Sequence, residues 1–278
     1  MSAVDTYLAR LGVDRPAAPT LDALVEIHHR HLEQVPYENL SIMLGRPPSV
    51  DGSDCLRRVG EVGRAGYCFH QNGAVELVLR DLGYDVSRRH GQVWTKPDEL
   101  ATPNLNHLVL VVSGLPTSAN PGGEWWFDVG LGDGFHDPLP LVDGTYQQGG
   151  ATYRLEDVRA DGWSFLHDPG GTFTGIAVTS APIGPAEVEA AHAVLSTPPG
   201  PFTGLTVVQR VDATGVDTVR GCLRTRGETT TVLSDFASWR AALVDLGLPL
   251  DGLDDAELEA LFDRMWAGHL AWEAAGRP

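Results

Sequence analysis

Cysteine, positive charge and long hydrophobic runs are all scarce in this sequence. Only three of the 278 residues are cysteine, namely Cys55, Cys68 and Cys222. An odd number of cysteines without short spacings excludes a disulfide framework and a zinc site of paired cysteines, so we expect a reducing, cytoplasmic setting. The first residues lack a basic patch followed by an apolar core, and no apolar stretch reaches the roughly 18 residues that a bilayer requires. We therefore expect neither a signal peptide nor a transmembrane helix.

The charge balance excludes further classes of partner. The sequence has 20 Lys and Arg against 37 Asp and Glu, which gives a formal net charge of −17. General binding to nucleic acids or to an anionic membrane requires a basic surface, so we predict neither partner. An anionic small molecule remains compatible, because backbone dipoles at a pocket can override the net charge. The hydrophobic content of 42% suffices for one enzyme body of two or three subdomains.

The hydrophobic pattern changes along the chain from helical to extended and then to a mixture. Residues 20–33 and 72–82 repeat apolar positions at helical spacing, with Thr20 as N-cap, and we place the start of the second helix near Cys68. Runs rich in Val, Leu and aromatic residues predict an antiparallel sheet or barrel in the middle third. The last third mixes both patterns, so the predicted class is α+β. The predicted strands are 85–93, 107–112, 124–129, 152–155, 163–166, 175–178, 205–211, 218–223 and 229–233, and the later helices are 185–194, 235–246 and 254–274.

A single cysteine lies where a reactive thiol is favoured. Cys68 follows the Gly66 turn and precedes a helical run, so the positive end of the helix dipole favours its thiolate. His107 opens one predicted strand and Asp128 ends the next. If these strands are antiparallel neighbours, the start of one lies beside the end of the other, and the helix of Cys68 can dock across both. A thiol, an imidazole base and a carboxylate that orients the base make an activated nucleophile.

Each of these residues also has an ordinary interpretation. A lone cysteine is more often inert core, a histidine at a strand start is usually hydrogen-bonded or on the surface, and an aspartate before Val-Gly is usually a turn residue. Their co-occurrence with flanking glycines favours the nucleophile. His28 and His31 share a helix face, but no carboxylate set completes a metal site, so we expect a solvated helix face there.

Five segments resemble sequence motifs of the arylamine N-acetyltransferase family. Residues 64–72 resemble its Arg-Gly-Gly-x-Cys-x-Glu-x-Asn signature, and residues 35–40 resemble its Pro-Phe-Glu-Asn-Leu element. Residues 106–110 are similar to the family's histidine strand, and residues 128–132 to its Asp-Val-Gly-Phe-Gly segment. Residues 196–202 resemble the Ser-Thr-x-Pro-x-Ser-Pro-Phe stretch of its third domain. The resemblance covers nearly the whole chain in matching order and spacing.

This resemblance implies three domains around a core like that of cysteine proteases. It implies that residues 1–83 form a helical domain with the nucleophile, residues 84–183 a β-barrel with the histidine and aspartate, and residues 184–278 an α/β lid. It also implies ping-pong transfer of an acyl group from acetyl-CoA, or another acyl-CoA, to an aromatic amine or hydrazine. The expected partners are these small molecules, for a monomer or homodimer that holds no metal and no permanently bound cofactor.

The resemblance assigns a role to each matching residue. Cys68 is the nucleophile, His107 is the base and acid, and Asp128 orients the imidazole. Backbone N–H groups near Cys68 hold the tetrahedral oxyanion. The implied acceptor contacts are Tyr37, Phe69, Val93 and Phe202, and the implied CoA contacts are Leu105, Asn106, Gly130 and Gly132.

Two departures from the family pattern affect the expected site. His70 stands where the family has a glutamate, so Arg64 needs another acid, for which Glu38 is the candidate. His70 itself is either a surface imidazole or a source of positive potential that favours the thiolate. Asp133 stands in a loop that approaches CoA in relatives, where an acid facing the phosphates disfavours them.

Three other functions remain open from the sequence. An amide synthase of natural-product biosynthesis would use a larger acyl-CoA or an acyl group on a carrier protein. A thioester or amide hydrolase would use the same three side chains with water as the acceptor. A binding protein without activity is disfavoured, because it has no need for all three groups.

Overall fold

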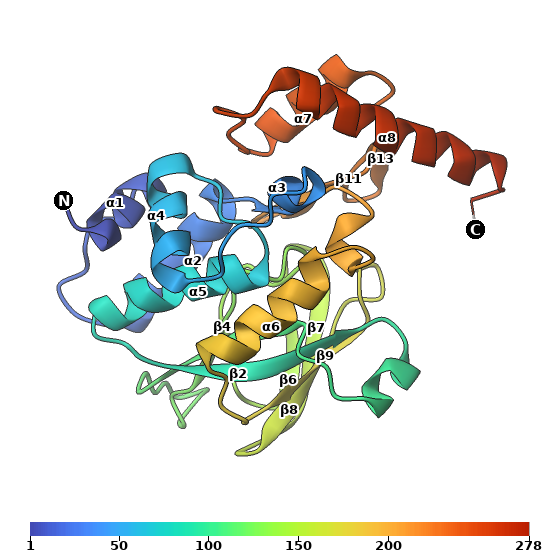
Figure 1. The fold of residues 1–278 in the computed structure, drawn as a ribbon. Helices are drawn as coiled ribbons and strands as arrows, with labels where there is room; N and C mark the ends of the chain where they lie inside the picture. The colour runs from blue at the N-terminus through green and yellow to red at the C-terminus, as the bar shows by residue number, and fades with distance from the viewer. Residues whose placement is uncertain (278) are drawn as a thin grey trace.

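Helices form the first part of the chain in the structure, a computed structural model that describes residues 1–277. Figure 1 shows them gathered on one side of the molecule. Thr20 caps the second helix as predicted, because its hydroxyl accepts a hydrogen bond from the backbone N–H of Ala23 at 3.2 Å. These helices are α1 (Ala3–Leu11), α2 (Leu21–Gln34), α3 (Leu40–Met43), α4 (Gly52–Val62) and α5 (Cys68–Asp81).

The central helix of this group is α5. Its first eight residues carry no acid and no lysine or arginine, and they are buried on all sides. A helix without a polar face has to be covered all round. Accordingly α1 and α4 pack on one side of α5, and strands β2 (Asp85–Trp94) and β3 (His107–Ser113) pack on the other. This burial holds the N-terminal end of α5 against the sheet.

An antiparallel sheet of eight strands follows and nearly closes into a barrel. Within it β3 pairs with β4 (Trp125–Phe127), and Leu110 lies opposite Phe127. The two strands are therefore antiparallel neighbours, as the argument from the sequence required. The strand order is β5 (Leu139–Pro140), β4, β3, β2, β9 (Gly175–Thr179), β8 (Gly162–Leu166), β7 (Ala151–Arg159) and β6 (Gly144–Gln148). The two edge strands approach where the Tyr146 hydroxyl of β6 lies 3.5 Å from the Pro140 carbonyl of β5.

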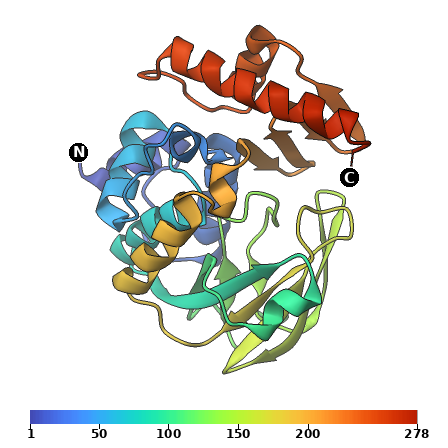
Figure 2. The same cartoon turned by 45° about the vertical axis from the view of Figure 1, so that its right-hand side comes forward.

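A second sheet of five strands lies between the barrel and the last two helices (Figure 2). Its first strand, β1 (Tyr37–Glu38), comes from the N-terminal helical part, and Tyr37 pairs with Gln209. One face of this sheet, which bears Val208 and Val219, packs on the last two helices. The predicted boundary at residue 83 does not anticipate that β1 joins a sheet of the third segment. The other strands are β10 (Val207–Asp212), β11 (Gly215–Arg220), β12 (Leu223–Arg226) and β13 (Thr229–Val232), and the helices are α7 (Phe236–Asp245) and α8 (Asp255–Ala274).

The connection between the two sheets runs through α6 (Pro185–Ser196), which crosses the barrel beside α5 in Figure 1. Its Val188 and Leu195 pack in one cluster with Tyr67 and Phe69. The α6 helix therefore covers the N-terminal end of α5. Two short 3-10 helices complete the fold, η1 (Pro97–Ala101) and η2 (Pro201–Thr203).

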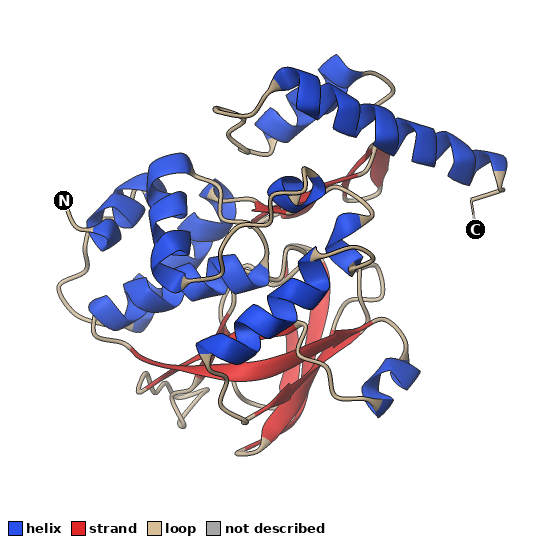
Figure 3. Ribbon diagram, viewed as in Figure 1, coloured by secondary structure: helices blue, strands red, loops and turns tan. Residues whose placement is uncertain are grey.

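Helices and antiparallel sheets together make up the structure, and most helices of the first part of the chain lie beside the barrel (Figure 3), which confirms the predicted α+β class. The sequence pattern missed α1, α3 and α4 but identified α2, α5, α6, α7 and α8 within a few residues of their observed bounds. Within residues 1–277, no helix has both the length and the apolar character needed to cross a bilayer.

Candidate functional site

Cys68 is the first residue of α5, and two glycines let other segments approach it closely. Gly66 has a φ of +118°, and a Cβ atom at this position would lie 2.6 Å from Nδ1 of His70. Gly130 lies in the loop after β4, and a Cβ atom there would lie 2.6 Å from Cα of Cys68. Glycine is therefore required at both positions, so that the turn can lie against His70 and the loop after β4 can lie against Cys68.

His107 and Asp128 meet at the ends of neighbouring strands. His107 is the first residue of β3, and Asp128 directly follows β4. Nε2 of His107 and Oδ2 of Asp128 are 2.6 Å apart, and both side chains are at most 3% exposed. Since Nε2 is bonded to the carboxylate, the other ring nitrogen, Nδ1, is the one that remains for Cys68.

The carboxylate of Asp128 accepts hydrogen bonds from four donors. Its Oδ2 accepts from His107 and also from Nε1 of Trp126 at 3.0 Å. Its Oδ1 accepts from Nδ2 of Asn72 at 2.7 Å and from the backbone N–H of Gly130 at 3.0 Å. A carboxylate held by four donors has one orientation, so it fixes the imidazole tautomer with a proton on Nε2.

The charges at this site favour the protonated imidazole. Burial lowers the pKa of His107, but the charge of Asp128 and the charge and hydrogen bond of Cys68 outweigh burial and raise this pKa to about 10. The Sγ atom of Cys68 also donates weakly to the carbonyl oxygen of Asn106 at 3.8 Å. The arrangement can form a thiolate–imidazolium pair and can pass a proton to a leaving group.

A cavity of about 360 Å³ opens onto both Cys68 and His107. Its walls come from both sheets, from α5 and from the chain around η2, so no single part of the fold forms it alone. It is open to small molecules of the size that enzyme pockets commonly hold. Five of the predicted contact residues line this cavity, namely Tyr37, Val93, Asn106, Gly130 and Phe202.

Three other predicted contact residues do not line it. Phe69 is fully buried and packs against the ring of Tyr67. Leu105 packs against the same apolar cluster. Gly132 lies against the ring of Tyr37, and a Cβ atom there would lie 3.1 Å from Cγ of Tyr37. These residues shape the packing around the wall rather than its surface.

The phenol of Tyr37 lies among charged groups of the cavity. Burial raises the pKa of Tyr37 and the neighbouring Cys68 raises it further, whereas the positive charge of Arg220 opposes this shift. The phenol therefore stays protonated and can donate a hydrogen bond to a bound molecule.

His70 differs from both expectations drawn from the sequence. It is fully buried, so it is not a surface imidazole. Burial also lowers its pKa to about 3, so the ring is neutral and adds no positive potential near the thiol. The ring packs against Gly66 and contacts the ring of His192 on α6, while its Nε2 bonds to the Pro48 carbonyl at 3.2 Å. Its role in the structure is to fill the space between the glycine turn and α6.

Arg64 and Glu38 form no ion pair within residues 1–277, contrary to the predicted pairing. Oε2 of Glu38 accepts a hydrogen bond from the backbone N–H of Leu40 at 2.5 Å. Burial raises the pKa of Glu38, and the charges of Arg58 and Arg64 oppose that shift from a longer distance. The interaction is therefore electrostatic rather than a direct contact.

Asp133 is engaged within the barrel and does not line the cavity. Its Oδ2 accepts from the backbone N–H of Thr172 at 2.7 Å, and its Oδ1 lies 3.7 Å from Nε2 of His167. The carboxylate thus holds the loop that carries Thr172, a residue of the cavity wall.

His28 and His31 lie in the core, so the expected solvated face is wrong. Both are fully buried. Nδ1 of His28 bonds to the His136 carbonyl at 2.7 Å, and its Nε2 lies 3.1 Å from the Asp128 carbonyl. His31 bonds through Nε2 to Oε1 of Gln71 at 2.9 Å. The polar face of α2 turns inward because these partners satisfy its imidazoles.

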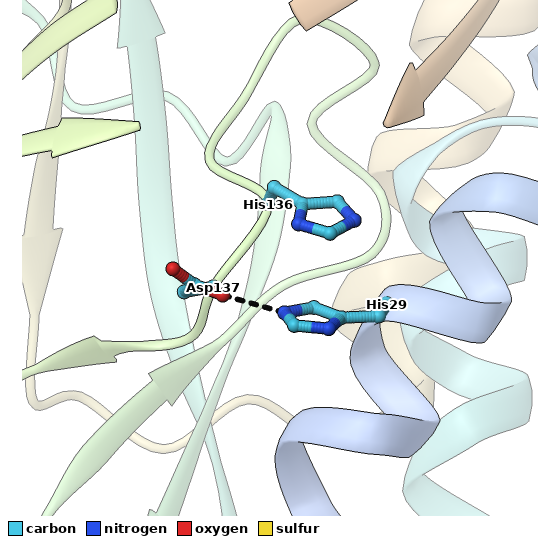
Figure 4. A group of neighbouring side chains, drawn as sticks. All are labelled: His29, His136 and Asp137. Atoms are coloured by element: carbon cyan, nitrogen blue, oxygen red, sulfur yellow. Dashed lines mark hydrogen bonds and ion pairs between the residues drawn. The ribbon is translucent and has the colours of Figure 1, made fainter. Parts of the chain in front are cut away.

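A separate polar group, His29, His136 and Asp137, lies where α2 meets the loop after β4 (Figure 4). Nε2 of His29 is 2.5 Å from Oδ1 of Asp137, and the two imidazoles stack with centroids 4.0 Å apart. Both imidazoles already have carboxylate partners, because Nε2 of His136 lies 3.1 Å from Oε1 of Glu33. The group ties the helix to the loop, and it carries no metal assignment.

Several further residues build this site without having been predicted from the sequence. Asn72 lies one helical turn after Cys68, and its side chain also accepts from the Val129 backbone N–H at 3.1 Å. Trp126 lies two residues before Asp128 and so shares its side of the strand. Spacing along the helix and the strand is the signal that could have identified both. No such signal exists for Gln209 and Arg220, which line the cavity from the second sheet.

A profile of the N-acetyltransferase family matches residues 20–222. An arylamine N-acetyltransferase of Mycolicibacterium smegmatis is 37% identical over 150 residues, which cover 51% of this chain and 51% of that protein. A proansamycin X synthase of Amycolatopsis mediterranei is 28% identical over 156 residues, which cover 55% of this chain and 57% of that protein. The chain thus spans about half the length of the curated relatives it matches.

Solved structures extend this similarity along the chain. The structure of Mycobacterium marinum arylamine N-acetyltransferase in complex with CoA matches with a TM-score of 0.83 at 27% identity. The match covers 94% of this chain and 99% of that one. The shared fold therefore extends beyond residue 222, where the segment matched by the family profile ends, before β12, β13, α7 and α8.

Proposed function

The chain belongs to the arylamine N-acetyltransferase family, and from this premise we propose that it transfers an acyl group from acyl-CoA to an aromatic amine or hydrazine. One observation carries the proposal. His107, bonded to Asp128 at 2.6 Å, and Cys68 at the N-terminus of α5 open together onto one cavity. This combination supplies a nucleophile, a proton carrier and room for a substrate.

In the first half of the reaction the thiolate of Cys68 attacks the carbonyl carbon of the donor thioester. The new C–S bond leaves negative charge on the carbonyl oxygen, which backbone N–H groups at the start of α5 can stabilise. The intermediate then collapses, the bond to the donor sulfur breaks, and the imidazolium of His107 gives its proton to the departing thiolate. The products are an acyl-Cys68 thioester and a free thiol.

In the second half the acceptor amine attacks the acyl-Cys68 carbonyl. Neutral His107 takes a proton from the amine nitrogen, and the thiolate of Cys68 leaves as the amide forms. Asp128 keeps the imidazole in one tautomer during both halves. Tyr37, Val93 and Phe202 form the walls against which an aromatic acceptor would pack, and the Tyr37 hydroxyl can donate to its polar group.

Intact-mass spectrometry after mixing the protein with acetyl-CoA tests this proposal. We expect one acetyl adduct, which a subsequent addition of an arylamine discharges. The adduct should be absent from Cys68→Ser and present in the matched control Cys55→Ser, since Cys55 lies on α4 and outside the cavity that contains Cys68. Formation of an equal adduct in Cys68→Ser, or of none in the unmodified protein, would falsify the proposal.

A second candidate is an amide synthase that uses a larger acyl group, supplied by CoA or a carrier protein. The similarity to a proansamycin X synthase favours it. The cavity of about 360 Å³ favours a small acyl group instead. Competition among acetyl-CoA, a medium-chain acyl-CoA and an aryl-acyl-CoA distinguishes the two, because the synthase requires the bulky donors to be preferred.

A further inference from the structure

A second cavity lies between the turn that joins β11 to β12 and one face of α8. It measures about 440 Å³ and shares two wall residues, Leu205 and Arg220, with the cavity that contains Cys68. The α8 helix contributes Arg264, Met265, Gly268, His269 and Trp272, which recur at helical spacing and so lie along one face. The two cavities therefore adjoin at Arg220.

The wall of this second cavity is positive although the protein is strongly acidic. The net charge is −17, yet none of its lining residues within 1–277 is Asp or Glu. Arg220 makes no ion pair and no side-chain hydrogen bond in the part of the chain that the structure describes. Arg264 donates to the Met43 carbonyl at 3.1 Å but has no carboxylate partner there. Two guanidinium charges thus face this cavity without neutralisation.

His269 adds an independent observation. It is only 9% exposed, and its buried Nε2 has no hydrogen-bond partner among residues 1–277. The Oε1 atom of Glu273 lies 3.7 Å away, beyond hydrogen-bond distance, and bonds to Arg277 at 2.6 Å. A buried polar nitrogen without a partner is costly, and a bound group that accepts a hydrogen bond removes that cost.

We propose that this second cavity binds the phosphate groups of the acyl donor through Arg220, Arg264 and His269, an inference that rests on the proposed function. Guanidinium groups match phosphate oxygens in charge and geometry, and His269 can donate to a further oxygen. No carboxylate of the wall opposes the anion. The chemical class expected here is therefore a phosphate ester or diphosphate.

The sheet register supplies the path between the two ends of such a donor. Arg220 pairs with Val207, and Tyr37 pairs with Gln209, two positions further along β10 on the same face. Val207, Gln209 and Tyr37 all line the cavity that contains Cys68. A donor with its thioester at Cys68 can therefore extend along this face and place its phosphates beyond Arg220.

Kinetics with two donors test the inference. Acetyl-CoA carries the phosphates, whereas S-acetyl-N-acetylcysteamine offers the same thioester without them. We expect Arg220→Gln and Arg264→Gln each to raise KM for acetyl-CoA about tenfold. Arg264 lies outside the cavity that contains Cys68, so Arg264→Gln should leave kinetics with the phosphate-free donor unchanged. Arg210→Gln is the matched control, because Arg210 bonds to the Asp245 carbonyl at 3.2 Å and lines neither cavity. Equal losses with both donors, or no loss with either, overturn the inference.

Calorimetric titration separates this inference from the proposed function. Titration of the unmodified protein and of Arg220→Gln with CoA and with inorganic phosphate needs no turnover. Weaker CoA binding in Arg220→Gln supports the phosphate site even if no acetyl adduct forms, an outcome that removes only the proposed function. Undiminished CoA binding in Arg220→Gln overturns the phosphate site even if the adduct forms. Binding of inorganic phosphate that CoA does not displace also overturns it, because the cavity then serves free phosphate.

Discussion

Cys68 and Cys55 are both buried thiols in the first turn of adjacent helices, yet their surroundings differ. Cys55 on α4 donates to the Ser49 carbonyl at 3.3 Å, and burial raises its pKa to about 12. Cys222 resembles it, since burial raises its pKa to about 11. Only Cys68 faces an imidazole that a carboxylate orients. From this difference in surroundings we predict that a helix N-terminus and burial alone leave a thiol inert, and that the His107–Asp128 pair activates Cys68.

Of the changes that test this comparison, removal of the charge of Asp128 should have the largest effect on the rate of acyl transfer. Asp128→Asn keeps the size of the side chain but loses the charge that holds the imidazole in its tautomer. We expect the rate of acyl transfer to fall about 10³-fold or more. The matched control is Asp133→Asn, which alters a carboxylate bonded to Thr172 in the neighbouring loop. Steady-state rates of both variants, with circular dichroism as a check of folding, decide the matter. A loss below tenfold in Asp128→Asn would mean that Cys68 needs no oriented base.

Alkylation should separate the two thiols next. We expect iodoacetamide to modify Cys68 about 10²-fold faster than Cys55 at a pH below the ordinary thiol pKa of about 8.5, because the imidazolium favours the thiolate. Peptide mass spectrometry measures the two rates in one sample. Since Cys68 lines a cavity and Cys55 does not, access alone could produce a preference. His107→Gln leaves that access in place, so the selectivity should largely disappear in this variant. Retained selectivity would attribute the difference to access.

The sequence was sufficient to place Cys68, His107 and Asp128 at the ends of the elements that carry them. A glycine turn before a helix placed Cys68, and strand ends placed His107 and Asp128. These signals are local, because each depends on residues within one turn or one strand. The same kind of local signal gave a wrong prediction for α2, because the histidines expected on its solvated face are buried. His28 and His31 are buried because their partners, which include the Asp128 carbonyl and Gln71, lie far along the chain.

The cavity wall was less predictable than the nucleophile. β1 has only two residues, too few to show a period, and it pairs with β10 across a long sequence separation. Gln209 and Arg220 reach the cavity through that pairing, so no pattern near Cys68 points to them. The predicted ion pair between Glu38 and Arg64 is also wrong, because Glu38 accepts a hydrogen bond from the backbone N–H of Leu40 instead. Strand pairing between distant segments and hydrogen bonds to the backbone cannot be predicted from a single sequence.

His107 should also make the stability of the protein depend on pH, an effect smaller than those on the rate of acyl transfer and on alkylation. The pKa of His107 is raised to about 10 in the folded protein, against about 6.5 when unfolded. The folded state therefore holds a proton that the unfolded state loses between these values. The stabilisation is complete below the unfolded pKa and is lost as the pH rises through the folded pKa.

Urea unfolding across that interval measures this contribution. We expect the free energy of unfolding to fall with rising pH in the unmodified protein and to fall less steeply in His107→Gln. Burial of Cys55 and Cys222 also makes the folded protein less stable at high pH, because their thiols ionise more readily in the unfolded state. Both proteins share that loss, so the difference between the two slopes isolates His107. Parallel slopes would show that the imidazole gains no proton on folding.

Removal of the Cys55 thiol should have the smallest effect of these changes on the rate of acyl transfer. Cys55→Ala deletes a fully buried sulfur and its hydrogen bond to Ser49, so we expect a loss of about 1–2 kcal/mol in the free energy of unfolding. The rate of acyl transfer should stay within about twofold, a change too small to indicate lost transition-state contact.

Cys55 lies on α4, which packs directly on α5. The two helices are thus close enough for a packing defect to reach Cys68. If Cys55→Ala folds but transfers acyl groups more than tenfold slower, the position of α5 depends on the Cys55 side chain. The two thiols would then be coupled, and the oriented imidazole alone could not explain their difference.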